Sequence, residues 1–258
     1  MRYLALLIFL SLALAQPVSL VQAGGRGIHS LLWLPDGRIL LGHHDGVRIS
    51  TDGGRSWGDL YKKTDFEALS LVLGGNRVLV AGHGVLAEWR GEGSLRLLKP
   101  KGLPANLEAY TLNPKNPRQH FAWDMNQRLF GSSDGGQTWR KLPAQGLPPP
   151  DPSGTTMVHA LAVGAGSELY LSGMGVGLWV SYDSGNRFTP LSSPETEITT
   201  LVVASDGSLW AGGIAGLWRR AGSGWLRQGQ GSVLVLALNP RNPLNLLWAD
   251  IQWQLWWR

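Results

Sequence analysis

Short apolar segments recur along the chain at nearly regular intervals, with turn-forming residues between them. Six such segments have similar patterns: 29–33, 67–71, 108–112, 159–163, 199–203 and 234–238. When their central residues are aligned, successive segments lie 38, 41, 51, 40 and 35 residues apart. Repeats of about 40 residues are typical of propeller blades.

Each repeat also contains further strand-like segments after its first. Asp-Gly turns at 35–37 and 205–207 precede second segments, and third segments begin at 46, 128 and 177. Asp-Gly steps suit such turns because glycine adopts positive φ without steric cost. The pattern predicts an all-β protein: a β-propeller of about six blades, mostly of four antiparallel strands.

The last repeat is short and ends with the apolar segment 253–257. Residues 17–21 are strand-like and precede the first repeat. An unpaired edge strand invites aggregation. We therefore expect the N-terminal strand to complete the last blade and close the ring.

The first 15 residues have the pattern of a secretory signal. A positive charge at Arg2 precedes an apolar run that ends in Ala13-Leu14-Ala15, and Ala23 offers a second cleavage site. The apolar run is shorter than the roughly 20 residues of a membrane-spanning helix. We expect a signal peptide at 1–15 and one propeller domain at 16–258, secreted or periplasmic, with no membrane span after cleavage.

Composition excludes several kinds of site. The chain has no Cys, so disulfides, Cys-ligated zinc and thiol catalysis are absent. Its net charge of +5 is spread along the sequence rather than gathered into a basic stripe. We therefore expect no nucleic-acid partner, and a monomer.

Three repeats carry the pattern S-x-D-x-G-x-x-[WF] after their third strand. Its positions are occupied by Ser50, Asp52, Gly54 and Trp57; by Ser132, Asp134, Gly136 and Trp139; and by Ser181, Asp183, Gly185 and Phe188. The Asp can accept N–H bonds from the turn that it starts, the Gly can take positive φ, and the aromatic ring can be buried. We interpret all twelve residues as structural.

These segments resemble the Asp-box (BNR) repeats of sialidases, sortilin-type domains and photosystem II assembly factors. Together with 28–31, 42–46 and 81–84, they also resemble small exported bacterial proteins described as glycosyl-hydrolase-like or exo-sialidase-like. The resemblance implies an exported propeller. The second, fifth and sixth repeats lack the full pattern, and Trp89, Trp225 and Trp256 are expected to replace its aromatic residue.

A catalytic role has weaker support than a binding role. The Arg-Ile-Pro segment of sialidases is absent, and no suitable Tyr–Glu pair is evident. A glycosidase with two carboxylates from distant strands stays open, with Glu67, Glu108 and Asp124, and also Asp250, as candidates. We favour a non-catalytic binding or assembly propeller with a protein or carbohydrate partner, and a glycosidase-like or sialidase-like hydrolase is the alternative.

Five of the six histidines are expected on one face, opposite the Asp-box turns. They fall at the start of first strands or the end of second strands: His29, His43, His44, His83 and His159. Imidazoles beside carboxylates can bind a divalent metal such as zinc or copper, or can transfer protons. The simpler interpretation is that they satisfy loop hydrogen bonds. The trio His29, His43 and His83 is the preferred metal candidate because neighbouring blades supply it.

We predict that the exported chain begins at Gln16, because small residues at Ala13 and Ala15 precede it. N-terminal sequencing of the protein recovered from its host checks this. A chain that still starts at Met1 would contradict the prediction of export.

Overall fold

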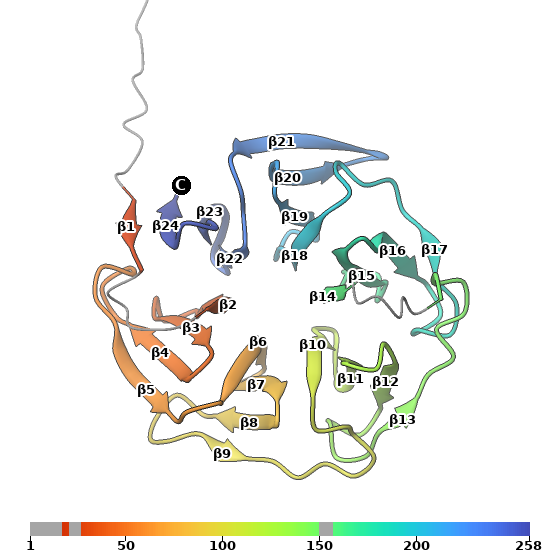
Figure 1. The fold of residues 1–258 in the computed structure, drawn as a ribbon, viewed down its shortest axis with the longest axis horizontal. Coiled ribbons are helices and arrows are strands. Elements are labelled where there is room, and N and C mark those ends of the chain that lie inside the picture. Colours follow the sequence, from red (N-terminus) through yellow and green to blue (C-terminus); the bar gives the residue numbers. More distant parts are fainter. Residues whose placement is uncertain (1–16, 21–26, 150–156) are drawn as a thin grey trace, which may run out of the picture.

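The computed structural model describes residues 17–20, 27–149 and 157–258. They form six four-stranded antiparallel sheets that surround a central axis as the blades of a propeller (Figure 1). The predicted all-β class and six-blade architecture are confirmed. The proposed signal peptide and both proposed cleavage sites lie outside the described residues, and no helix in the described part is long and apolar enough to cross a membrane.

The first three blades use consecutive strands. Blade 1 contains β2 (Ile28–Trp33), β3 (Ile39–His43), β4 (Gly46–Ser50) and β5 (Gly58–Lys62). Blade 2 contains β6 (Glu67–Gly74), β7 (Arg77–His83), β8 (Val85–Trp89) and β9 (Arg96–Leu97). Blade 3 contains β10 (Leu107–Asn113), β11 (Asn116–Asp124), β12 (Leu129–Ser132) and β13 (Arg140–Lys141).

The remaining blades follow the same plan, with one exception in the last. Blade 4 contains β14 (Met157–Val163), β15 (Leu169–Met174), β16 (Gly177–Ser181) and β17 (Thr189–Pro190). Blade 5 contains β18 (Ile198–Val203), β19 (Leu209–Gly213), β20 (Gly216–Ala221) and β21 (Gly224–Gln230). Blade 6 contains β22 (Val235–Asn239), β23 (Asn242–Ala249), β24 (Gln254–Trp257) and β1 (Val18–Ser19).

The apolar core consists of six layers, one between each pair of neighbouring blades. In the layer between blades 1 and 2, for example, Leu40 and Val47 pack with Ala68 and Val80. The five other layers have the same plan. Second strands such as β3 and β19 are buried along their whole length, because each is covered by a blade on either side.

The sixth layer joins the last blade to the first. Ile28 and Ile39 of blade 1 pack there with Val235 and Leu247 of blade 6. At the outer edge, Val18 pairs with Leu255, and the Leu20 side chain is 2% exposed. The N-terminal segment therefore pairs with the last blade where the sequence placed it. That the ring needs this strand for closure stays a prediction.

The three aspartate turns (50–57, 132–139 and 181–188) share one hydrogen-bond pattern. In the first, the Ser50 hydroxyl donates to Asp52 Oδ1 at 2.8 Å and accepts the Gly54 N–H at 2.8 Å. Hydrogen bonds from the Ser56 hydroxyl and N–H lower the pKa of Asp52 to about 2. The Ser–Asp and Gly–Ser bonds recur in the other two turns. The aspartates are therefore engaged within their own turns.

The second blade has an ion cluster in place of an aspartate turn. The Glu88 carboxylate is 1% exposed and accepts hydrogen bonds from Arg77, Arg90 and Arg96. The adjacent Trp89 is 3% exposed, and its Nε1–H donates to Gly93 O at 3.0 Å. The ring thus occupies a buried position like that of the turn aromatics.

We predict that Trp139→Ala destabilises the protein by about 3–5 kcal/mol, the usual cost of emptying a buried aromatic site. Trp139 is 8% exposed, whereas Trp57 at the equivalent position is only half-buried. Trp57→Ala should therefore cost clearly less. Urea unfolding of both variants measures the difference, and equal midpoints would contradict this ranking.

We also predict that the N-terminal strand stabilises the closed ring. A chain that starts at Val21 should melt below a chain that starts at Gln16, because Leu20 leaves its buried site. That loss is worth about 2 kcal/mol, or roughly 4–8 °C in melting temperature. Identical melting temperatures would show that the layer between blades 6 and 1 closes the ring without this strand.

Candidate functional site

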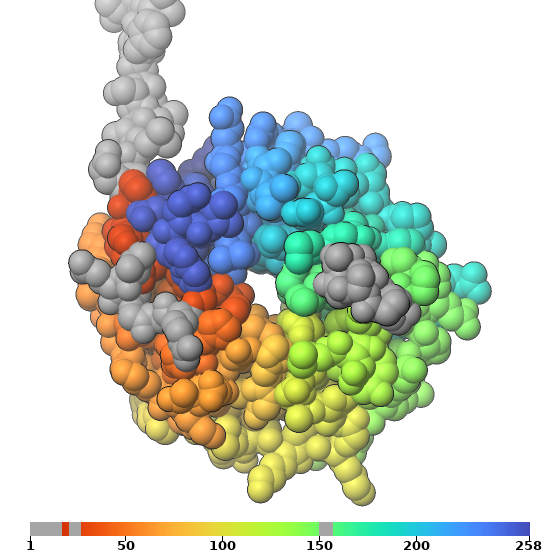
Figure 2. All heavy atoms as spheres, in the orientation of Figure 1, coloured from red at the N-terminus to blue at the C-terminus, as the bar shows by residue number. Residues whose placement is uncertain are grey.

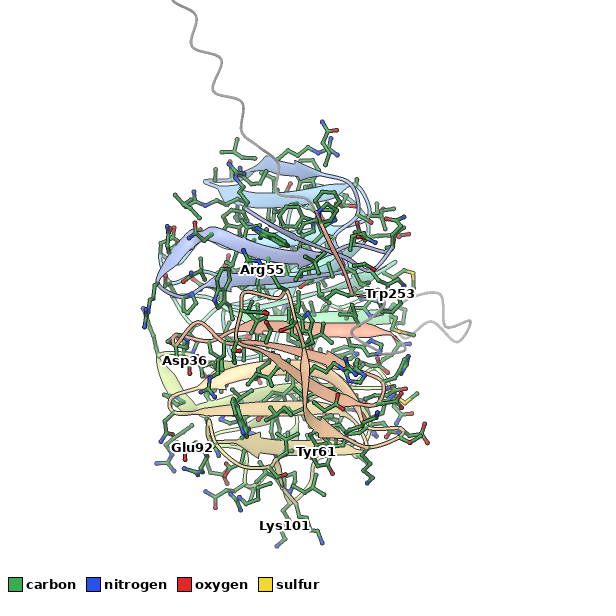
Figure 3. The ribbon with its side chains drawn as sticks, turned by 90° about the vertical axis from the view of Figure 1, so that its left-hand side faces the viewer. Asp36, Arg55, Tyr61, Glu92, Lys101 and Trp253 are labelled. Atoms are coloured by element: carbon green, nitrogen blue, oxygen red, sulfur yellow. The ribbon has the colours of Figure 1, made fainter. Side chains whose placement is uncertain are left out.

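Strand direction gives the propeller two different faces. First strands begin where second strands end, as the pairs Ile28–His43 and Glu67–His83 show. We call this the histidine face, and the opposite side the aspartate-turn face. In Figure 3, Trp253 marks the edge of the histidine face and Asp36 the opposite edge.

On the histidine face, imidazoles and carboxylates from three blades form a connected chain. His44 Nδ1 lies 2.8 Å from Glu67 Oε1. The other oxygen, Glu67 Oε2, lies 2.5 Å from His83 Nδ1, and His83 Nε2 lies 3.0 Å from Glu108 Oε1. We call these four residues the His–Glu chain. It connects blades 1, 2 and 3 at their ends on the histidine face.

Both nitrogens of His83 face carboxylate oxygens. A neutral imidazole carries one N–H, and an ionised carboxylate only accepts hydrogen bonds. Both bonds of His83 are therefore satisfied together only when the ring carries a second proton or one of the carboxyls is protonated. The His83 ring therefore bridges Glu67 and Glu108 through its two nitrogens.

The electrostatics of Glu67 are set by its histidine neighbours. Burial alone would raise the pKa of Glu67, but the hydrogen bond from His44 and the charges of His83 and the other histidines outweigh it, so that the pKa is lowered. The Glu67 carboxylate is therefore held in its ionised form.

His29 packs against this chain without a hydrogen-bond partner for Nε2 among the described residues. Its ring meets the His44 ring edge-on, with 4.5 Å between centroids. Burial, and then His44, lower the pKa of His29 to about 4, so the ring is neutral above that pH. Gly27, at φ +64°, permits this packing, because a Cβ there would lie 2.5 Å from His44 Cδ2.

The other two predicted histidines, His43 and His159, are near the His–Glu chain but form no hydrogen bond with its four residues. His43 is 2% exposed, and its Nδ1 accepts the Asp45 N–H at 3.2 Å. Burial lowers the pKa of His159, and the nearby Glu108 opposes that shift. Across the described residues, no group of three or more His, Asp and Glu is arranged to hold a metal ion. The trio His29, His43 and His83 thus gains no metal-binding geometry, and His44 is the histidine that joins His83 on Glu67.

Two of the carboxylates that the sequence offered as catalytic candidates are hydrogen-bonded within their own hairpins. Asp124 is 1% exposed and accepts hydrogen bonds from the backbone and guanidinium of Arg128. Asp250 accepts hydrogen bonds from Gln254 N–H and from the Trp256 indole. Each carboxylate is engaged within its own hairpin. The remaining catalytic candidates, both on the histidine face, are therefore Glu67 and Glu108.

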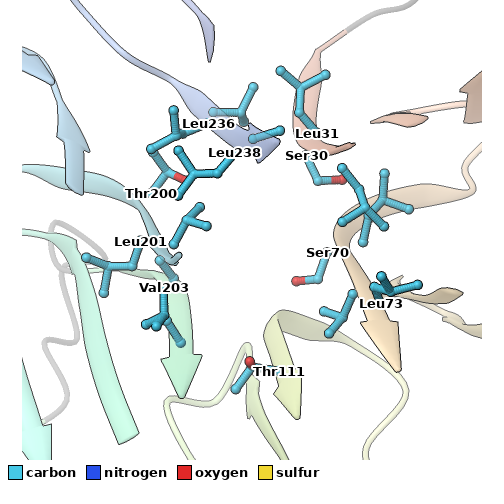
Figure 4. A pocket seen from close by; sticks show the side chains of 18 of the residues that line it. Ser30, Leu31, Ser70, Leu73, Thr111, Thr200, Leu201, Val203, Leu236 and Leu238 are labelled. Carbon is cyan, nitrogen blue, oxygen red and sulfur yellow. The ribbon is translucent and has the colours of Figure 1, made fainter. Parts of the chain in front are cut away.

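A channel of about 340 Å³ follows the propeller axis between the six first strands. Aliphatic side chains and a few hydroxyls surround it, among them Leu31, Leu201 and Thr111 (Figure 4). His29 and His159 lie at its mouth on the histidine face. A hollow is visible there in Figure 2, which looks onto this face. No Lys or Arg is among the channel-lining residues.

The sequence reasoning missed an apolar group on the same face. Of nine exposed large hydrophobic side chains in the described residues, five lie at strand ends of the histidine face: Met125, Met157, Met174, Ile214 and Ile251. We call these the apolar rim. In Figure 3 the visible sulfur atoms lie along the edge marked by Trp253. For four of the five, the available signal is an apolar residue in or beside the hairpin between second and third strands, where polar residues are usual; Met157 instead begins the first strand β14.

Comparison with known proteins supports the fold alone. No protein-family model and no curated protein matches the chain. Among solved structures, a GH74 xyloglucanase from Xanthomonas campestris has a TM-score of 0.63 at 17% identity, covering 90% of this chain and 43% of that one. This chain thus spans less than half of that enzyme's length.

Two other structures match over most of their own length. YCF48 bound to D1 peptide has a TM-score of 0.55 at 15% identity, covering 86% of this chain and 74% of that one. A gluconolactonase from Xanthomonas campestris has a TM-score of 0.67 at 12% identity, covering 90% and 86%. The relation to Asp-box repeats rests on the aspartate turns and stays a prediction.

We predict that acid destabilises the protein partly through His29. The unfolded ring takes up a proton near pH 6.5, whereas the folded ring does so only near pH 4, so stability falls as pH falls between these values. His43, His120 and His159 act in the same direction.

Urea unfolding at pH 7 and pH 4.5 measures this loss. In His29→Asn the loss should be smaller by roughly 1–2 kcal/mol, after allowance for solvent screening. An unchanged loss in the variant would show that His29 gains a proton on the native protein as readily as on the unfolded chain.

Proposed function

We propose that this protein is a non-catalytic binding or assembly propeller that works outside the cytosol and binds a protein partner through its histidine face. One observation carries the proposal. The face combines polar groups held in place by the His–Glu chain with the exposed side chains of the apolar rim. Interfaces commonly combine pre-positioned polar groups with exposed apolar side chains.

The same geometry argues against a glycosidase. A paired-carboxylate mechanism places the sugar bond between two carboxyl groups about 5–9.5 Å apart. Here the His83 ring lies between Glu67 and Glu108 and bonds to both. Asp124 and Asp250 are occupied by their own hairpins. None of these four described carboxylates therefore forms a pair with an open space between its members, which is the arrangement that a paired-carboxylate glycosidase needs.

The structural neighbours are compatible with both functions, since they include a xyloglucanase, a gluconolactonase and a protein bound to a peptide. At 12–17% identity they do not decide between them. The preference for binding rests on this chain's own residues. Carbohydrate stays the second class of partner, because the histidine face combines hydrogen-bonding groups with exposed apolar side chains.

Because the chain has no cysteine, an introduced one can be labelled selectively. We predict that a photo-reactive group at Ile251→Cys, on the histidine face, cross-links a discrete partner from the exported proteins of the host. The matched control is Leu244→Cys, which is similarly exposed (61% against 56%) but lies at the aspartate-turn face.

The expected result is a cross-linked species from the Ile251 position and none from the Leu244 position. Cross-links confined to the Leu244 position would place the partner on the aspartate-turn face and contradict the proposal. Turnover of aryl glycosides that disappears in Glu108→Gln would instead favour the hydrolase.

A further inference from the structure

The two kinds of surface on the histidine face are separated by blade. Blades 1, 2 and 3 supply the His–Glu chain. Blades 3, 4, 5 and 6 supply the apolar rim. The channel mouth lies between them, on the axis. A partner that covers this face therefore meets an acidic, hydrogen-bonding side and an apolar side together.

The polar side is suited to a cation. Among the described residues, Glu67 and Glu108 form ion pairs with histidines and none with Lys or Arg. A carboxylate has about four lone-pair sites, so the three bonds of the chain use fewer than half of the sites on the two glutamates.

Partial burial strengthens the attraction between these two carboxylates and a cation. The side chains of Glu67 and Glu108 are 25% and 12% exposed, so solvent screens them less than a surface carboxylate. His29, whose ring packs on His44, connects the His–Glu chain to the lining of the largely aliphatic channel. The rest of the molecule carries an excess of positive charge, with a net charge of +5 for the whole chain. Glu67 and Glu108 are therefore two partly buried carboxylates that a cation can approach on an otherwise basic protein.

The apolar side is suited to aliphatic or aromatic side chains. Ile214 and Ile251 are each 56% exposed, and Met125 is 52% exposed. Methionine adapts its shape to different apolar partners and is common at surfaces that bind peptides. Five such residues on one face offer contacts to more than one partner side chain.

We propose that the histidine face binds an extended protein segment in which a lysine or arginine lies among apolar residues. The cationic group binds at Glu67 and Glu108, and the neighbouring apolar side chains pack on the apolar rim. This assignment rests on the proposed binding function and adds the chemistry of the partner to it.

Selection from a random library of displayed dodecapeptides tests the proposal, with the immobilised protein as target. Enriched sequences should contain Lys or Arg together with apolar residues. A synthetic peptide of the enriched sequence should bind at least tenfold more weakly when its cationic residue is replaced by norleucine. This arm changes the ligand alone, so it is independent of the folding of any variant.

Variants of the protein locate the site. Glu67→Gln/Glu108→Gln should weaken binding of the same peptide at least tenfold, and Ile214→Ser/Ile251→Ser severalfold. The matched controls on the aspartate-turn face are Asp36→Asn and Leu244→Ser, which should leave the Kd unchanged. Melting temperatures of all variants verify that they are folded.

Several results would overturn the proposal. Enrichment of acidic peptides, with loss of binding in the rim variant, would refute the cationic partner and leave the binding function standing. Enriched peptides unaffected by any histidine-face variant, or no enrichment at all, would count against both. Self-association in sedimentation experiments that the rim variant abolishes would show that a second copy of the chain covers this face instead.

Discussion

The packing of each blade against the next is the interaction on which this molecule depends. Its apolar residues form six layers between neighbouring blades rather than one central core. A blade removed from the ring would expose apolar side chains on both of its faces. The contact of Ile28 and Ile39 with Val235 and Leu247 is therefore as necessary as the other five, although the residues that make it lie at opposite ends of the chain.

This ring geometry also creates the site. The six first strands surround the axis and begin at the same face, so residues from separate repeats meet around one mouth (Figure 1). His44 and Glu67 are 23 residues apart, and His83 and Glu108 are 25 apart, yet each pair is within hydrogen-bond distance. Because every blade is fixed by its neighbours, these side chains are positioned before any ligand binds.

Carboxylates on the two faces have different kinds of hydrogen-bond partner. On the aspartate-turn face, Asp52, Asp134 and Asp183 are engaged by hydroxyls and N–H groups of their own turns, which leaves them a structural role. On the histidine face, carboxylates are bonded to imidazoles from other blades, and apolar side chains remain exposed beside them. The polar groups available for a partner are those that form no hydrogen bonds within their own turns.

The sequence by itself determined what depends on local patterns: the β-strands, the repeat and hence six blades, the aspartate turns, and the end of the blades at which the histidines lie. Which histidine meets a carboxylate was decided only by tertiary structure. His43, the last residue of β3, is buried, whereas His44 lies in the hairpin and reaches Glu67. A shift of register between Ile28 and Ser30 alters which side chains face the axis, and no pattern reveals it. The channel and the placement of the apolar rim on one face likewise follow from how the closed ring positions each blade. The bonds of Asp124 and Asp250 are local, but they depend on the geometry of each hairpin rather than on the residue pattern.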